Sequence, residues 1–195
     1  MIFANNEQGE DWIVRLDGEE VQRPEITIGA GESREFVVSG DDLGVGWLKV
    51  RSNVPLVGHL FYRVRAQGSG AELLEVPILP VRGRQFRTAL APGRNDQLAL
   101  ALVNLATEPV TVHVEILENE TEWRLTSRRG VELQPGEHVA SFLSEFLGSE
   151  VTIPSDFRGG TLTIRATAQG AANLAATVIK TRNGLPLAIL PVIAE

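Results

Sequence analysis

Cysteine is absent from this chain of 195 residues. Without thiols the chain has no disulfides, no thiolate-bound metal or iron–sulfur site and no cysteine nucleophile. Lysine is scarce too, because Lys49 and Lys180 are the only two and the other basic residues are arginine. The net charge of −7 provides no long-range field that would attract nucleic acid or an anionic membrane surface. We therefore expect neither thiol chemistry nor nucleic-acid binding.

Long apolar runs are also missing. No run approaches the roughly 20 residues that a membrane-spanning helix needs, and residues 1–5 lack the charged and then apolar layout of a signal peptide. We expect a soluble chain with no membrane insertion, and the missing signal peptide is consistent with a domain excised from a longer protein. The composition, 43% hydrophobic and 22% charged, is that of a globular protein rather than a disordered one.

Common enzyme motifs are not found. The chain contains no Gly-x-Ser-x-Gly, no Walker-type phosphate loop and no His-Glu-x-x-His, which removes several nucleophile, phosphate and zinc chemistries. His59, His113 and His138 lack the short spacings of metal ligands, and we expect the last two to be solvated. We predict that the protein is not an enzyme and uses no cofactor, although paired catalytic carboxylates would be visible only in three dimensions.

Alternation of apolar and polar residues is the main pattern that is present. In residues 110–116, valine and isoleucine alternate with threonine, histidine and glutamate, which predicts a half-buried antiparallel strand. Similar stretches recur about every ten residues, separated by turn sequences such as Asp17-Gly18, Pro135-Gly136 and Asn183-Gly184. The spacing of apolar residues predicts one short helix over 141–147.

The chain also contains an internal repeat. Four pairs of segments match in the same order along the sequence, and ordered matches of this kind indicate duplicated structural units. The pairs are the apolar stretches ending at Asn5 and Asn104, Ile26–Ile28 with Val131–Leu133, Gly46–Arg51 with Gly160–Arg165, and Ile78-Leu79-Pro80-Val81 with Ile189-Leu190-Pro191-Val192.

These matches divide the chain into two copies. We assign copy one to residues 1–81, a short junction to 82–85 and copy two to 86–195, with an insertion around 142–158. Several short strands per copy with regular turns predict an all-β fold, namely two tandem immunoglobulin-like antiparallel β-sandwiches related by the repeat. The alternative is one larger sandwich formed by intimate pairing of the copies, since copy one is short for an independent sandwich.

Copy two has the segments 98–104, 110–117, 133–146 and 157–162, which look like a known kind of module. In these segments the chain resembles an uncharacterised tandem Ig-like β-sandwich repeat of secreted and cell-surface multidomain proteins of bacteria. The resemblance implies a secreted or cell-surface location and transfers no catalytic motif. Copy one follows it in outline but has no counterpart of the Phe-Leu-Ser-Glu-Phe segment at 142–146.

One mixed strand face is the sharpest candidate site for a ligand or partner. Its members alternate with apolar residues, so that they share one side of a strand. They are His59, Phe61, Arg63 and Arg65. Arginine forks and an aromatic ring suit an acidic ligand or partner. The alternative is that Phe61 packs against copy two and the face is buried.

Two weaker candidates lie elsewhere. Trp123 is flanked by polar residues and is a second candidate contact for a partner or a sugar, whereas Trp12 and Trp47 have the neighbours of core residues. Asp41 and Asp42 precede a glycine turn and form a weak calcium candidate. Because no Asp-x-Asp-x-Asp-Gly loop brings further oxygens together, we predict no metal site.

These features predict a non-catalytic structural spacer or protein-interaction module of a secreted or cell-surface bacterial protein. The alternative is a carbohydrate- or glycan-binding β-sandwich module that uses Trp123 or the Phe61 face, and an enzyme ranks third. A protein or glycan partner is therefore expected. The two leading hypotheses differ in one property, since a binding module presents an exposed aromatic patch and a spacer presents polar faces.

Overall fold

The computed structural model is built almost entirely from β-strands. It describes residues 2–6, 13–39, 46–65, 72–78, 81–91, 96–118, 124–126, 130–148, 157–182, 185–190 and 192–194. Antiparallel pairing joins the strands of each sheet, and among the described residues the one helix has five residues. The predicted all-β class is therefore confirmed.

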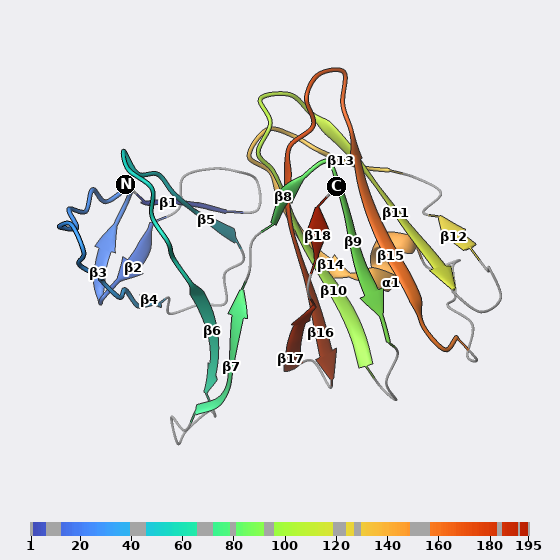
Figure 1. The fold of residues 1–195 in the computed structure, drawn as a ribbon, viewed down its shortest axis with the longest axis horizontal. Helices are drawn as coiled ribbons and strands as arrows, with labels where there is room; N and C mark the ends of the chain where they lie inside the picture. Colours follow the sequence, from blue (N-terminus) through green and yellow to red (C-terminus); the bar gives the residue numbers. More distant parts are fainter. Residues whose placement is uncertain are drawn as a thin grey trace.

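Copy two contains most of the regular structure (Figure 1). The last residue assigned to copy one and the junction form β8 (Val81–Gly83), which pairs into a sheet of copy two, and the junction also contributes the first residue of β9 (Gln85–Leu90). The other elements of copy two are β10 (Asp96–Asn104), β11 (Val110–Glu118), β12 (Arg124–Thr126), β13 (Val131–Leu133), β14 (His138–Phe142), α1 (Leu143–Leu147), β15 (Gly160–Thr167), β16 (Leu174–Arg182), β17 (Leu185–Leu190) and β18 (Ile193–Ala194). One sheet has the order β14-β10-β16-β17, with β8 also on β16. The other has the order β12-β11-β15-β9-β18, with β13 also on β11.

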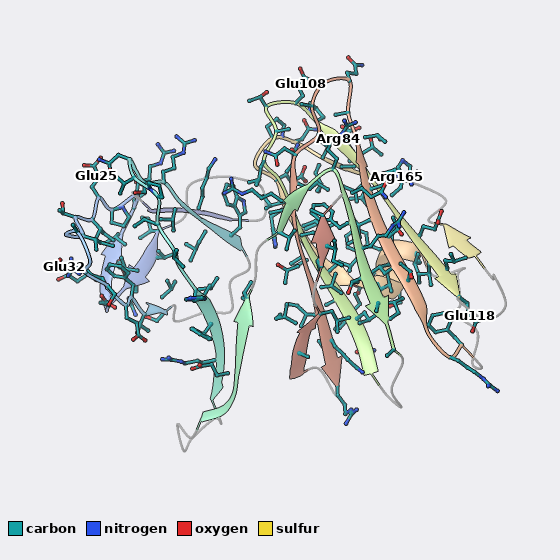
Figure 2. All side chains as sticks on the ribbon, viewed as in Figure 1. Glu25, Glu32, Arg84, Glu108, Glu118 and Arg165 are labelled. Carbon is teal, nitrogen blue, oxygen red and sulfur yellow. The ribbon has the colours of Figure 1, made fainter. Side chains whose placement is uncertain are left out.

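The two sheets of copy two enclose one hydrophobic core. Along β11 buried and half-buried positions alternate without interruption, as the alternating sequence predicts for a strand with one face on a core. Leu100, Leu174 and Val178 from one sheet and Phe86 and Leu162 from the other are fully buried in this core. Side chains fill the space between the sheets (Figure 2), so the strand pattern of 110–116 leads directly to a two-layer packing.

Helix α1 follows the predicted position. It begins after β14 and buries Leu143, Phe146 and Leu147 against the core. The Glu145 carboxylate accepts hydrogen bonds from the Ser141 hydroxyl and, at 2.8 Å, from the Phe142 amide, an amide that the helix itself leaves unpaired. The turn therefore closes one end of the sandwich with its own polar groups satisfied.

A Glu145→Gln variant should show a small, pH-dependent loss of stability. The hydrogen bonds from Ser141 and Phe142 lower the pKa of Glu145 below 4.5. Stabilisation by the carboxylate is therefore complete above 4.5 and is lost as the pH falls through the lowered value in the folded state. We expect the variant to melt at a lower temperature than the parent at neutral pH and the two circular-dichroism melting curves to converge in acid. A gap that stays constant into acid would contradict this assignment.

Copy one is built from shorter pieces. Its strands are β1 (Ile2–Asn6), β2 (Val14–Leu16), β3 (Glu19–Val21), β4 (Val38–Ser39), β5 (Gly46–Val50), β6 (Leu60–Arg65) and β7 (Glu72–Ile78). Strand β1 pairs with β5, β2 pairs with both β3 and β4, and β6 pairs with β7. Asp17 and Gly18 both have positive φ between β2 and β3, which is the conformation of a tight hairpin turn and confirms the turn predicted there.

The copies touch at two places. The Trp47 indole of β5 donates a hydrogen bond of 2.9 Å to the Gly136 carbonyl in a turn of copy two, and β7 lies near β17. Burial, with the charges of Arg51 and Arg82, lowers the pKa of Lys49 on β5, and Arg82 belongs to β8 of the sandwich. Strand β5 therefore faces copy two at the join between the units.

Candidate functional site

The predicted mixed face begins just before β6. His59 is exposed, and Phe61 on the strand itself keeps 46% of its side chain exposed. The two rings lie 6.5 Å apart with their planes tilted by 34°. Phe61 is therefore not enclosed against copy two, as the alternative interpretation required. An exposed aromatic ring beside an imidazole is a surface that a partner can contact.

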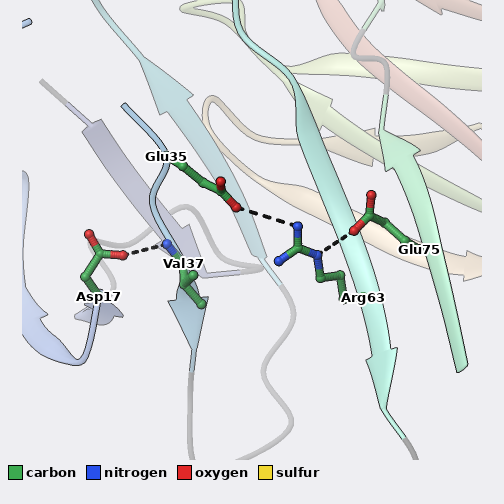
Figure 3. Close-up of polar contacts among 5 residues, drawn as sticks. All are labelled: Asp17, Glu35, Val37, Arg63 and Glu75. Carbon is green, nitrogen blue, oxygen red and sulfur yellow. Dashed lines mark hydrogen bonds and ion pairs between the residues drawn. The ribbon is translucent and has the colours of Figure 1, made fainter. Parts of the chain in front are cut away.

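Arg63 belongs to a polar network that holds β6 in place (Figure 3). Its Nε donates to the Glu75 carboxylate of β7 at 2.6 Å, and its other guanidinium end lies 3.6 Å from the Glu35 carboxylate. In the same region, Asp17 accepts a hydrogen bond of 2.7 Å from the Val37 amide. These contacts connect the β6–β7 hairpin to the segment that precedes β4.

This network changes what the mixed face can bind. Two carboxylates of the chain itself already approach Arg63, so an acidic ligand would have to compete with them. Exposed ion pairs contribute little stability, typically about 0–1 kcal/mol, which means that the competition is not prohibitive. Phe61 is accessible, whereas the guanidinium of Arg63 is already engaged within the chain.

The remaining predicted site residues lie wholly or in part outside the described structure. The Arg65 side chain lies outside the described part of the structure, although its backbone belongs to β6. Trp123 and the weak calcium candidates Asp41 and Asp42 also lie outside the described residues. Their proposed roles therefore stay predictions.

Two acidic or basic residues of copy two differ from expectation. His138 was predicted to be solvated, but it is buried with 8% exposure at the start of β14, opposite Val103 of β10. The prediction was wrong because His138, two residues after the Pro135-Gly136 turn, is already the first residue of β14 and pairs with β10 in the sheet. Glu118 is also buried, and its carboxylate accepts a hydrogen bond of 3.1 Å from the Arg158 amide. This carboxylate is therefore part of the folded structure and is not a solvated turn group.

Exposed apolar side chains in copy one are the feature that sequence reasoning missed. Among the described residues, every exposed large apolar side chain except Ile193 belongs to copy one. They are Ile13, Val37, Val38, Leu48, Val50, Val54, Leu56, Val57, Leu60 and Phe61. By contrast, among the residues of that copy whose side chains are described, the buried apolar ones are Val14 and Leu16. The alternation of apolar and polar residues alone predicts that several of these side chains face a core.

The sequence matches between the copies allow the exposure of corresponding side chains to be compared. Leu48 is 37% exposed and Val50 is 58% exposed, whereas their matches Leu162 and Ile164 are 0% and 1% exposed. The sequence pattern that faces a core in copy two therefore faces no complete core in copy one. Large exposed apolar surfaces on a folded chain usually mark interaction sites.

Other classes of site find less support in the described residues. Within them, no group of three or more histidine, aspartate or glutamate residues is arranged to hold a metal ion. A shallow depression lies along β13 and β14, between Val131 and Ala140. The helix in the described part of the chain is too short to cross a membrane. No family model, no curated protein and no solved structure matches this chain.

Proposed function

We propose that this chain is a non-catalytic protein-interaction module of a secreted or cell-surface bacterial protein, built from two immunoglobulin-like sandwich units. The observation that carries the proposal is the contrast between the copies. Leu48 and Val50 are exposed, while their matches Leu162 and Ile164 in copy two are buried, and Leu60 and Phe61 add to the exposed apolar surface of copy one. Copy two serves as a rigid support and copy one as the unit that meets a partner.

The interaction role is favoured over that of a plain spacer by the surface of copy one. A spacer gains nothing from exposed leucine and phenylalanine, because these side chains promote association. Burial of apolar area stabilises a complex by about 25 cal/mol per Å² before the costs of association are counted. The secreted or surface setting is supported only by the resemblance of copy two to bacterial extracellular repeats.

A glycan-binding role is the second candidate, and one observation favours it. The exposed Phe61 ring lies beside His59, and sugars stack on exposed aromatic rings while neighbouring polar groups bind their hydroxyls. On the same side of the strand, however, Arg63 is already engaged by Glu75 and Glu35, which makes it less able to bind sugar hydroxyls. A protein partner therefore fits this face better than a sugar.

Binding of the intact chain to peptide and glycan arrays tests the proposal. We expect signals on peptides rich in apolar and β-branched residues, and we expect a Phe61→Ser variant to lose them. Ile193→Ser is the matched control, because Ile193 is 67% exposed but lies on copy two. Phe61-dependent signals on glycans alone would favour the second candidate, and the absence of Phe61-dependent signals on either array would overturn both.

A further inference from the structure

Two turns of the chain share one geometry, 29–32 in copy one and 134–137 in copy two. In each turn the fourth residue is a glutamate, whose amide donates to the carbonyl of the first residue at 3.1 and 3.0 Å respectively. The glutamate carboxylate in turn accepts a hydrogen bond from the amide of the first residue, at 3.0 and 2.6 Å. The third residue is a glycine, Gly31 or Gly136, with a φ of 76° or 80°, the value of the third residue in a type II turn. The two turns therefore present equivalent backbone surfaces.

In copy two this turn holds a strand of copy one. The Gly136 carbonyl accepts a hydrogen bond of 2.9 Å from the Trp47 indole. Trp47 and Lys49 lie on the same side of β5, and both are half-buried. A tryptophan whose ring is packed and whose N–H is satisfied is a typical interface anchor. The contact between the copies therefore shows what a turn of this geometry can bind.

The equivalent turn of copy one is exposed. All four of its residues are exposed, and a Cβ atom built at Gly31 would meet no other atom within 4 Å. Glu32, which belongs to this turn, lies on the side of copy one that points away from copy two (Figure 2). Copy two directs its turn toward copy one, and copy one directs its own turn the same way, toward solvent. This is the polarity of units that associate head to tail.

Charge indicates which kind of strand fits the turn of copy one. Residues 25–35 contain three glutamates and one arginine, and Glu25 and Glu32 both lie at this end of the copy (Figure 2). The side of β5 that meets copy two presents Trp47 and Lys49 at alternate positions. A strand of that pattern is complementary to the exposed turn in hydrogen bonding and in charge, and complementary charge steers and orients association.

We propose that the 29–32 turn of copy one binds a β-sandwich unit of another polypeptide, through a strand that presents a tryptophan and a lysine or arginine at alternate positions. The partner's indole donates to the Gly31 carbonyl, as the Trp47 indole donates to that of Gly136. The partner's basic residue lies near the glutamates of the turn. This site uses none of the exposed apolar side chains of copy one.

Strand β15 of copy two can be given the outward side of β5, which tests the proposal on the intact chain. Thr161 and Thr163 occupy the positions of Trp47 and Lys49 in the matched segments, and both are half-buried on β15. The double variant Thr161→Trp/Thr163→Lys presents the proposed strand to the 29–32 turn of a second molecule. We expect sedimentation velocity to show association at least about tenfold tighter than that of the parent chain.

Two glycines provide matched controls for this association. Gly31 and Gly18 have positive φ, 76° and 90°, and both lie in exposed turns of copy one with open space around them. Alanine is strained at either position, so a general loss of folding would affect both variants alike. We expect Gly31→Ala to return the double variant to the association of the parent and Gly18→Ala to leave it unchanged. Association that survives Gly31→Ala, or that both substitutions weaken equally, would overturn the proposal.

A synthetic peptide with the sequence of residues 46–51 gives a second measurement on the parent chain. We expect saturable changes of the nuclear magnetic resonance shifts of the amides of 30–32, and at least about tenfold weaker binding of the Trp47→Ser peptide. Ala30→Pro gives the turn the proline that copy two has at Pro135 and should tighten binding, because proline favours this turn position. If the peptide leaves these amides unchanged and the double variant associates no more than the parent, the proposal is wrong.

This inference rests on the proposed interaction function but concerns another surface, so the two can fail separately. Phe61-dependent array binding without Gly31-dependent association would leave the interaction function standing and remove the head-to-tail partner. Gly31-dependent association without Phe61-dependent array signals would support the turn site and remove the role of the apolar side chains.

Discussion

Replacement of Leu162 by alanine is expected to destabilise copy two by about 2–5 kcal/mol, the range for removing a buried leucine. Leu162 is fully buried on β15, between the neighbouring strands β11 and β9. The loss combines the transfer of its side-chain atoms out of water with the cavity left behind, because strands paired on both edges cannot collapse into the space. Urea unfolding followed by circular dichroism measures it.

Leu48→Ala is the matched control, because Leu48 is the repeat partner of Leu162. Its side chain is 37% exposed on β5, where water and not a closed core meets part of it. We expect Leu48→Ala to lower the free energy of unfolding by about 1 kcal/mol or less. If the two variants lost the same stability, copy one would be as closed as copy two, and the interaction function would lose its basis.

Much of the local structure could be predicted from the sequence. The alternation of apolar and polar residues in 110–116 predicts β11, and the turn sequence Asp17-Gly18 predicts the first hairpin. The spacing of apolar residues near Ser141 predicts α1. These succeed because each signal is local, and because a strand with one buried face must alternate wherever it lies in the fold. The internal matches also align β5 with β15 residue by residue.

The exposed surface of copy one could not be predicted in the same way. Alternation at Leu48 and Val50 states which side of the strand is apolar, but not whether a second layer covers that side. Coverage depends on pairings between distant segments, and these are set by which strands are available.

The candidate face shows the same limit. Sequence placed Phe61 and Arg63 on one side of a strand, and the structure agrees in the exposure of Phe61. Glu75 approaches Arg63 because the two residues are paired across the β6–β7 hairpin. Glu35 approaches it through the folding of a segment more than twenty residues away, for which the sequence has no local marker. A charged residue's partner is a property of topology rather than of spacing.

Asn104, at the end of β10, forms hydrogen bonds that join three segments of copy two. Its amide nitrogen donates to the carbonyls of Glu108 and Leu133 at 2.8 and 2.9 Å, and its side-chain oxygen accepts from the Ala106 amide at 2.8 Å. Its own backbone pairs with Gly136 and Glu137 in the turn after β13. The residue is fully buried, so water cannot replace these bonds.

An Asn104→Ala variant is expected to lose about 3–5 kcal/mol, because three main-chain groups lose their partner and each unsatisfied buried group costs about 1–3 kcal/mol. Asn104→Asp keeps the shape and the bond from Ala106 but directs a negative charge at two carbonyls. At neutral pH the Asn104→Asp variant should lose more stability than the Asn104→Ala variant. Its loss of stability should be smaller in acid, where a protonated carboxyl can donate one hydrogen bond. Gln97→Ala, exposed on the same strand, should change the urea midpoint little. An alanine variant as stable as the Gln97 control would show that the three segments hold together without Asn104.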